Sequence, residues 1–359
     1  MGRLIKTKFK DKRGIFFTFL AITVMVVFII VFTPQADITL QKDTQAMRTR
    51  SNSIDSFVSD LENGFLETVL RATTQKTLLS LAWYIKDQDF IQSDTKFAEY
   101  FRQVMYDGTI GDPPKPIDDY TKKFTGKDIM NGHTLKDWSE KIKDNAKKTL
   151  NVDVTITIDP TYPTKPTTIK ISQDPKFGTS WTTDVEMKVD ITVISEVGTW
   201  KKTGLLIKTS TNIEGLQDPY YLKNADKVLS RPIKNSAATF NEWNINKVET
   251  TLTAGAYTHW QSSDAPNFLS RFYNSIAASS CCGIESFVNP NDLSTNNPMN
   301  SYLDYKYWKG GLYCPSPPNP GLFKINGFPQ QFQDFRIDGN NQVKYKIQNS
   351  EVSPTCPPI

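Results

Sequence analysis

The chain has few of the side chains that most often perform catalysis or bind metals. Two of its 359 residues are histidines, His133 and His259, and neither lies at a spacing typical of a metal site. A Ser/His/Asp grouping can be assembled around His259 in HWQSSDAP, but it lacks the context of a nucleophile elbow. We find no phosphate loop, dinucleotide fingerprint or EF-hand loop either. The sequence therefore predicts a protein that is not an enzyme, with no catalytic residue, no cofactor and no metal.

Cysteine is also scarce. The four cysteines, Cys281, Cys282, Cys314 and Cys356, all lie in the last quarter of the chain. An even number in an oxidising compartment indicates two disulfides. Neighbouring cysteines rarely bond each other, so we expect Cys281 and Cys282 to reach different partners, Cys314 and Cys356, in an order that the sequence leaves open. Free buried thiols are the alternative, and a metal site is less favoured because neither histidine lies near.

Acidic clusters are the remaining candidates for cation binding. Asp87, Asp89 and Asp94 form one cluster, in which Asp87-x-Asp89 begins like a calcium loop but Ile91 stands where the next oxygen ligand is needed. Asp118 and Asp119 form a second cluster. We interpret both clusters as solvated surface acids. The chain also lacks an Asn-x-Ser/Thr sequon, so N-glycosylation is not expected.

The longest apolar run is Ile15 to Phe32, which has no charge, proline or glycine. As a helix, it would span roughly 27 Å, close to the thickness of a bilayer core. Six Lys/Arg residues precede it among the first 14 residues, and they account for the net charge of +4. The rest of the chain is near neutral, so it lacks the excess of basic residues that is typical of nucleic-acid binding. Positive residues stay inside, so we expect a single-pass cell-membrane protein with a cytoplasmic N-terminus and an extracytoplasmic body.

The segment in front of this run allows two interpretations. One is an uncleaved signal anchor. The other is a class III, prepilin-type signal, because Lys12-Arg13-Gly14 precedes Ile15 directly and cleavage would fall between Gly14 and Ile15. Pilins carry a glutamate at the fifth mature position, where this chain has Phe19, and that difference argues against filament assembly.

Apolar spacing predicts two or three helices between residues 40 and 106. A stripe at spacings of three and four includes Ile54, Val58, Leu61, Phe65 and Val69, interrupted by a weak point at Asn63-Gly64. Residues 108–116 are typical of a loop. A further helix over Thr134 to Leu150 begins with a capping box in which Asp137 replaces the usual Glu or Gln.

The pattern then changes to a period of two. Strands are predicted at 152–158 and 169–171, and the clearest alternation runs from Val185 to Val193. A turn at Gly198 leads into a returning strand, Trp200 to Thr211. We expect a long antiparallel hairpin with one polar face and one apolar face packed on the preceding helices.

Several stretches, taken together, resemble a known group. They are SFVSDLENGFLETVLRATTQKTLLSLAWYI (56–85), DGTIG (107–111), IDP (158–160), NIEGLQDPYYL (212–222), APNFLSRF (265–272), GIESFVN (283–289) and SYLDYKYW (301–308). In this order they resemble uncharacterised archaeal surface proteins with a class III, prepilin-like N-terminal signal. The resemblance implies a surface location and this architecture, and it implies no catalytic residue.

The C-terminal region is less regular. We expect helices at Asn244 to Leu252 and from Asp264, and strands at 301–308, 322–325 and 343–347. The proline-rich end, 353–359, should lack regular structure, with Cys356 as its tether. Tyrosines alternate with polar residues in the first of these strands. If exposed, Tyr302, Tyr305, Tyr307 and Trp308 would stack on a ligand.

The expected fold class is α+β, with an N-terminal transmembrane helix, membrane-proximal amphipathic helices and an antiparallel β-sheet ectodomain. The expected domains are a leader (1–14), a membrane helix (15–32), a helical region (33–110), an α+β domain (111–223) and a disulfide-containing region (224–359). We expect a membrane-anchored structural or interaction protein of the cell envelope, including a minor pilin-like subunit. Its partners would be membrane lipid, copies of itself or envelope and pilus proteins, and no nucleic acid. The alternative is a membrane-tethered binding module for a glycan or peptide.

Overall fold

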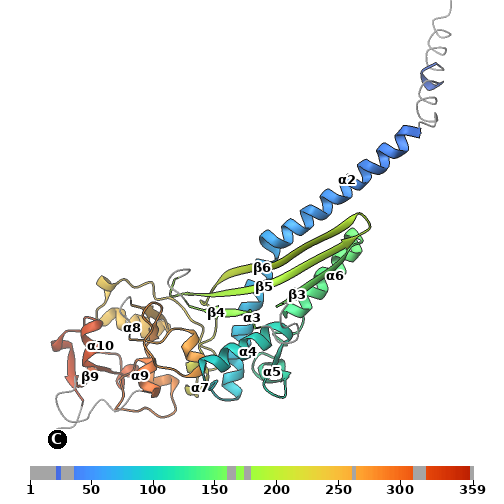
Figure 1. Cartoon of the computed structure of the whole chain (residues 1–359). Coiled ribbons are helices and arrows are strands. Elements are labelled where there is room, and N and C mark those ends of the chain that lie inside the picture. Colours follow the sequence, from blue (N-terminus) through green and yellow to red (C-terminus); the bar gives the residue numbers. More distant parts are fainter. Residues whose placement is uncertain are drawn as a thin grey trace, which may run out of the picture. The chain divides into compact units, whose positions relative to one another are not determined.

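The computed structural model describes residues 22–25, 36–159, 167–173, 179–260, 264–309 and 321–355. The chain divides into two compact units, Met1–Phe57 and Val58–Ile359. Helix α2 (Ala36–Asp60) makes up most of the described part of the first unit. The second unit is an α+β body, whose elements are labelled in Figure 1.

The expected transmembrane helix is the main correction to the sequence analysis. Among the described residues, no helix is both long enough and apolar enough to cross a membrane. Residues 22–25 are the described part of the expected span, and the rest of it, with the leader and the Gly14–Ile15 junction, lies outside the described residues. The finding contradicts the membrane helix of the expected fold class, the signal anchor and the single-pass localisation.

The predicted helices between residues 40 and 106 are confirmed as α2, α3 (Leu66–Asp87) and α4 (Asp94–Asp107). A π-helix, Leu61–Phe65, lies at the expected weak point. A π turn holds an extra residue and so rotates the apolar stripe. Phe65 is consequently 43% exposed, whereas Leu66 is buried. Including Phe65 in the buried stripe was therefore wrong.

Two further helices follow, α5 (Asp118–Thr125) and α6 (Leu135–Leu150). The capping box of α6 is confirmed: the Asp137 N–H donates to Thr134 Oγ1, and the Thr134 N–H donates to Asp137 Oδ2, each at 3.0 Å. The expected loop at 108–116 contains a short antiparallel pair, β1 (Thr109–Ile110) and β2 (Lys115–Pro116).

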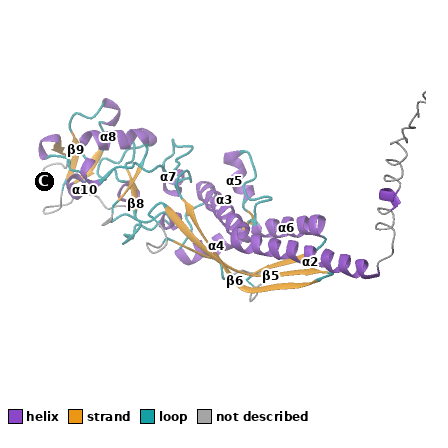
Figure 2. Ribbon diagram, turned by 90° about the horizontal axis from the view of Figure 1, so that it is seen from above, coloured by secondary structure: helices purple, strands orange, loops and turns teal. Residues whose placement is uncertain are grey.

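The predicted hairpin is confirmed as β5 (Thr182–Ser195) and β6 (Gly198–Asn212). On its other side β5 pairs with β3 (Asp153–Ile158) and then with β4 (Lys170–Ser172), and every pairing is antiparallel. Val185, Met187, Val189, Ile191 and Val193 are buried, as the period of two requires. Their face packs on helices, with α3 against β6 and α6 against β3 (Figure 2).

Short elements build the remainder of the chain. Its helices are α7 (Pro219–Asn224), α8 (Ile245–Ala254), α9 (Asp304–Lys309) and α10 (Gly339–Lys344). Its strands are β7 (Tyr257–His259), β8 (Ile284–Ser286), β9 (Leu322–Ile325), β10 (Arg336–Asp338) and β11 (Val352–Pro354). Among the described residues of this part, five 3-10 helices join them: Phe240–Glu242, Leu269–Tyr273, Pro290–Asp292, Gln330–Phe332 and Asn349–Glu351. Of the expectations here, the helix at Asn244 to Leu252 and the strand at 322–325 are confirmed.

Other expectations for this region were wrong. The segment 301–308 overlaps helix α9 and is not a strand, because periodicity in so short a run does not distinguish a strand from a helix. Tyr302 precedes the helix, and both Tyr302 and Tyr305 are buried. The segment 343–347 contains the end of α10, which Asp338 caps by accepting the Asn341 N–H. A 3-10 helix replaces the helix expected from Asp264. Ser353 and Pro354 pair with β9 in β11.

Candidate functional site

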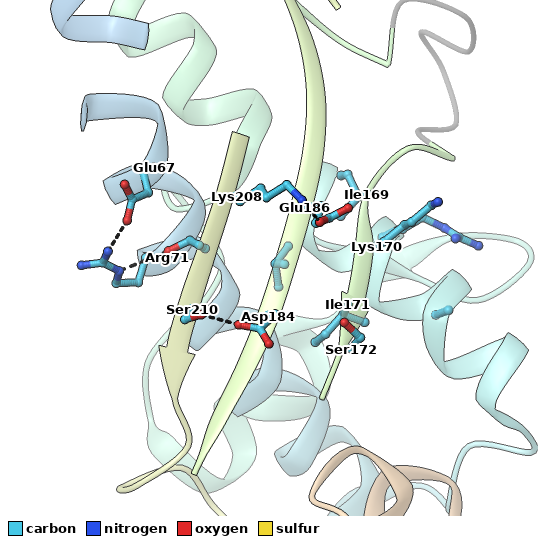
Figure 3. Close-up of a pocket in the computed structure, with 14 residues that line it drawn as sticks. Glu67, Arg71, Ile169, Lys170, Ile171, Ser172, Asp184, Glu186, Lys208 and Ser210 are labelled. Carbon is cyan, nitrogen blue, oxygen red and sulfur yellow. Dashed lines mark hydrogen bonds and ion pairs between the residues drawn. The ribbon is translucent and has the colours of Figure 1, made fainter. Parts of the chain in front are cut away.

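A hollow of about 730 Å³ opens against the sheet and adjacent residues of α3 and α4. It is lined from three strands, β4, β5 and β6, and Figure 3 shows its labelled side chains. Its volume falls within the range of about 300–1,000 Å³ that is usual for ligand sites. We call it the sheet groove, and it is our candidate functional site.

The strand register places polar side chains in two rows across the sheet groove. Lys170 and Lys208 both pair with Glu186, and Ser172 and Ser210 both pair with Asp184. Directly opposed residues point to the same face of a sheet, so each row is continuous over three strands. The Lys208 ammonium is ion-paired to Glu186, and the Ser210 hydroxyl donates to Asp184 (Figure 3).

Four of the described residues that line the groove are cationic, and two of these four are neutralised by an ion pair with another described residue. Arg71 pairs with Glu67, and its Nε donates to Thr209 Oγ1 at 3.2 Å. Lys208 pairs with Glu186. Lys170 is exposed and Arg102 is half-buried, and neither has an ion pair within the part of the chain that the structure describes. The groove therefore carries two positive charges available to an anionic ligand.

Asp184 is the most buried ionisable residue of the groove, at 7% exposure. Its Oδ1 accepts from Ser210, whereas its Oδ2 is buried without a hydrogen-bond partner among the described residues. An unsatisfied buried carboxylate oxygen is costly.

The strongest buried electrostatics lie elsewhere. Arg271 Nη1 is 2.8 Å from both Asp218 Oδ2 and Asp304 Oδ2, and all three side chains are fully buried. Burial raises the pKa of Asp304, and the Arg271 guanidinium opposes that rise. Tyr257 also donates to Asp218, at 2.7 Å. Because these side chains are shut off from solvent, we assign the cluster a role in stability.

The adjacent cysteines form a disulfide with each other, Cys281 to Cys282. The expectation that each bonds a different distant cysteine was therefore wrong. Cys314 and Cys356 lie outside the described residues. The expectation rested on the rule that neighbouring cysteines rarely bond each other. That rule contains no information on how the loop around these two cysteines folds.

Three of the four proposed stacking residues are buried, and the fourth, Trp308, is partly exposed. Tyr302, Tyr305 and Tyr307 are buried, and Trp308 packs edge-on against Tyr221 with ring centroids 4.7 Å apart. The three tyrosines belong to the interior of the C-terminal part of the fold, and the Trp308 ring is engaged by Tyr221. The expectation that they stack on a ligand is corrected for that reason.

Both histidines and the acidic clusters have structural contacts. His259 Nδ1 lies 2.8 Å from the Gly283 carbonyl, and burial lowers the pKa of His133. The Asp118 carboxylate accepts backbone N–H groups from Ile129, Met130 and Asn131, and Asp87 pairs with Lys123 at 3.0 Å. Within the described ranges, no three His, Cys, Asp or Glu residues gather in a group that could hold a metal ion.

Sequence reasoning missed the sheet groove. Lys170, Glu186 and Lys208 lie on three separate strands, and only the register brings them into line. The one signal available was the polar alternation of the hairpin, which indicates an exposed face without showing that it is hollowed. Comparison with family models, with curated proteins and with solved structures gives no match to this chain.

Proposed function

We propose that this protein is a non-enzymatic binding protein whose sheet groove holds an acidic polysaccharide. The observation that carries the proposal is the pair of cationic side chains, Arg102 and Lys170, that line the groove without an ion pair among the described residues. Carboxylate groups on a ligand chain would supply their missing partners. Guanidinium and ammonium groups form their strongest hydrogen bonds with such anions.

The rest of the lining suits sugar hydroxyls. Ser172 and Ser210 line the groove from strands on either side of β5. A serine hydroxyl both donates and accepts, and so does a sugar hydroxyl.

The proposal is tested with the full chain and two commercial polymers. Alginate carries a carboxylate on each sugar, and dextran is neutral. We expect alginate to bind with an affinity that falls as salt rises, because salt screens exposed charges. The double variant Arg102→Ala/Lys170→Ala should lose at least about tenfold in affinity, equivalent to roughly 1.4 kcal/mol.

The matched control is Lys136→Ala/Lys148→Ala on α6, which removes the same net charge at two exposed positions outside the groove. It should retain near-wild-type affinity. If both double variants lost the same alginate affinity, the loss would come from the change in net charge alone. That result would refute the groove as the binding site. Tighter binding to an acidic peptide library than to any glycan would assign the groove to peptides instead.

One observation favours a second role, as a structural subunit that assembles with copies of this chain or with envelope proteins. Strand β6 pairs only with β5 among the described strands, and residues 201–204 on it are exposed. An unpaired strand edge can accept a strand from another chain. The positive charges of Lys201 and Lys202 disfavour pairing of this edge with unrelated strands. Sedimentation showing a monomer at every concentration would contradict self-assembly.

A further inference from the structure

A second depression, of about 450 Å³, lies beside the Cys281–Cys282 disulfide. Its wall combines the end of β4, the 3-10 helix Leu269–Tyr273 and the loop that leads to Cys281. We call it the serine pocket. Ser172 lines both this pocket and the sheet groove, so the two depressions adjoin.

The chemistry of the serine pocket differs from that of the groove. No charged residue occurs among the described residues that line it. Six of the lining residues carry hydroxyls: Ser172, Ser270, Tyr273, Ser275, Ser279 and Ser280. Uncharged donors and acceptors recognise an uncharged polyol, since an ionic ligand would lose water without gaining an opposite charge.

Several of these hydroxyls are already fixed in orientation. Ser270 Oγ lies 2.9 Å from Asn267 Oδ1 and 3.1 Å from Tyr273 Oη. Ser275 Oγ accepts the Ala277 N–H at 3.2 Å. Each hydroxyl retains further hydrogen-bonding capacity for a ligand. Groups held in place before binding reduce the entropy cost of association.

The disulfide forms part of the wall and is held by the surrounding loop. The Cys282 N–H donates to Ser279 Oγ at 3.2 Å, and Ser180 Oγ donates to the Cys281 carbonyl at 3.4 Å. Cys281 Sγ lies 3.8 Å from the Gln173 carbonyl oxygen. Cys282 is buried, whereas Cys281 lines the pocket. Divalent sulfur is soft and polarisable, so Cys281 offers an apolar contact among the hydroxyls.

We propose that the serine pocket binds one neutral sugar ring of the polysaccharide whose acidic units lie in the sheet groove. The hydroxyls bond the ring's hydroxyls, and the Cys281–Cys282 disulfide packs against its carbon skeleton. This inference rests on the proposed function, because the shared Ser172 makes the pocket a continuation of the groove. It goes further by assigning a neutral sugar to a site whose described lining residues include no cationic side chain.

The test uses saturation-transfer NMR on the full chain with free glucose, galactose, mannose and N-acetylglucosamine. We expect transfer to at least one of these sugars at millimolar concentration. Ser280→Phe should abolish the signal, because Ser280 is exposed in the pocket and a phenyl ring would fill the space. Ser350→Phe, at an exposed serine outside the pocket, is the control and should retain the signal.

A second variant tests the disulfide. Cys281→Ser/Cys282→Ser keeps the size of both side chains nearly unchanged and removes the sulfur wall. We expect at least a tenfold weaker sugar affinity, with thermal unfolding of each variant showing that the chain is folded. An unchanged affinity in this variant would overturn the role of the disulfide.

The outcomes separate this inference from the proposed function. Arg102→Ala/Lys170→Ala should lose alginate binding but keep the saturation-transfer signal from the sugar. Ser280→Phe should lose the sugar signal and keep alginate binding, with at most a modest loss of alginate affinity. If wild type binds alginate but transfers saturation to none of the four sugars, the serine-pocket inference is overturned and the groove stands. If it binds a sugar but not alginate, the proposed function fails instead.

Discussion

The second unit contains two regions that place their charges differently. In the hairpin region, residues 58–212, ion pairs lie at the surface, such as Lys202 with Glu62 at 3.0 Å and Lys147 with Asp153 at 2.9 Å. In the C-terminal region, residues 213–355, several charged side chains are completely buried. These are Asp218, Arg271, Glu285, Asp304 and Asp338.

The difference follows from the length of the secondary structure. Strand β5 has 14 residues, and its alternation gives one continuous apolar face to the helices. The strands of the C-terminal region have three or four residues each, too few to make such a face. Its interior instead combines ion pairs with aromatic contacts, for example Trp243 against Tyr345 with ring centroids 4.6 Å apart. Short elements thus bury ion pairs in the C-terminal region, whereas the ion pairs named for the hairpin region stay in contact with water.

Among the variants that test this difference between the two regions, Arg271→Leu should lower the free energy of unfolding the most. The change leaves Asp218 and Asp304 buried without their cation. Removing one partner of a buried ion pair costs about 3–5 kcal/mol. Urea unfolding of the full chain measures the loss, and Arg271→Lys, which keeps the charge, should lose less. A loss below about 1 kcal/mol would show that the cluster contributes little to stability.

Glu285 gives the second prediction, through the pH dependence of stability. Its carboxylate is fully buried, and desolvation raises its pKa although Lys344 and Tyr345 bond to it. As the pH rises above 4.5, the ordinary pKa of a glutamate side chain, Glu285 ionises in the unfolded chain while it is still protonated in the folded chain. This single group therefore makes the fold less stable as pH rises, up to its folded pKa.

The variant Glu285→Gln removes that titration. Its free energy of unfolding, relative to wild type, should increase with pH by at most about 1.4 kcal/mol per pH unit, since one proton is involved. Urea unfolding at a series of pH values gives this difference directly, and titrations shared by both proteins cancel. A flat difference, or one that falls with pH, would contradict the raised pKa.

The smallest effect should come from Lys208→Ala in the hairpin region. Its ion pair with Glu186 is solvent-exposed, with side-chain exposures of 49% and 35%. Exposed pairs contribute roughly 0–1 kcal/mol and weaken in salt. A double-mutant cycle with Glu186→Ala measures the coupling. A coupling as large as that between Arg271 and Asp304 would remove the contrast between the two regions.

Elements with a long, regular pattern were predictable from the sequence. The capping box of Thr134 and Asp137 and the alternation from Val185 to Val193 gave α6 and β5 nearly to their ends. Short apolar runs were ambiguous, so 301–308 and 343–347 were assigned to strands although they contribute to helices. Tyr302 turned out to be a core residue because its surroundings, and not its spacing, decide where its ring packs.

The sequence by itself determined the α+β class and the two faces of the hairpin, since periods of 3.6 and 2 are local properties of the chain. Only the tertiary structure decided which distant residues meet. The row of Lys170, Glu186 and Lys208 depends on strand register, and the cluster of Asp218, Arg271 and Asp304 on packing that excludes water. The Cys281–Cys282 bond depends on the path of one loop. Register and desolvation are non-local, so no window of sequence contains them.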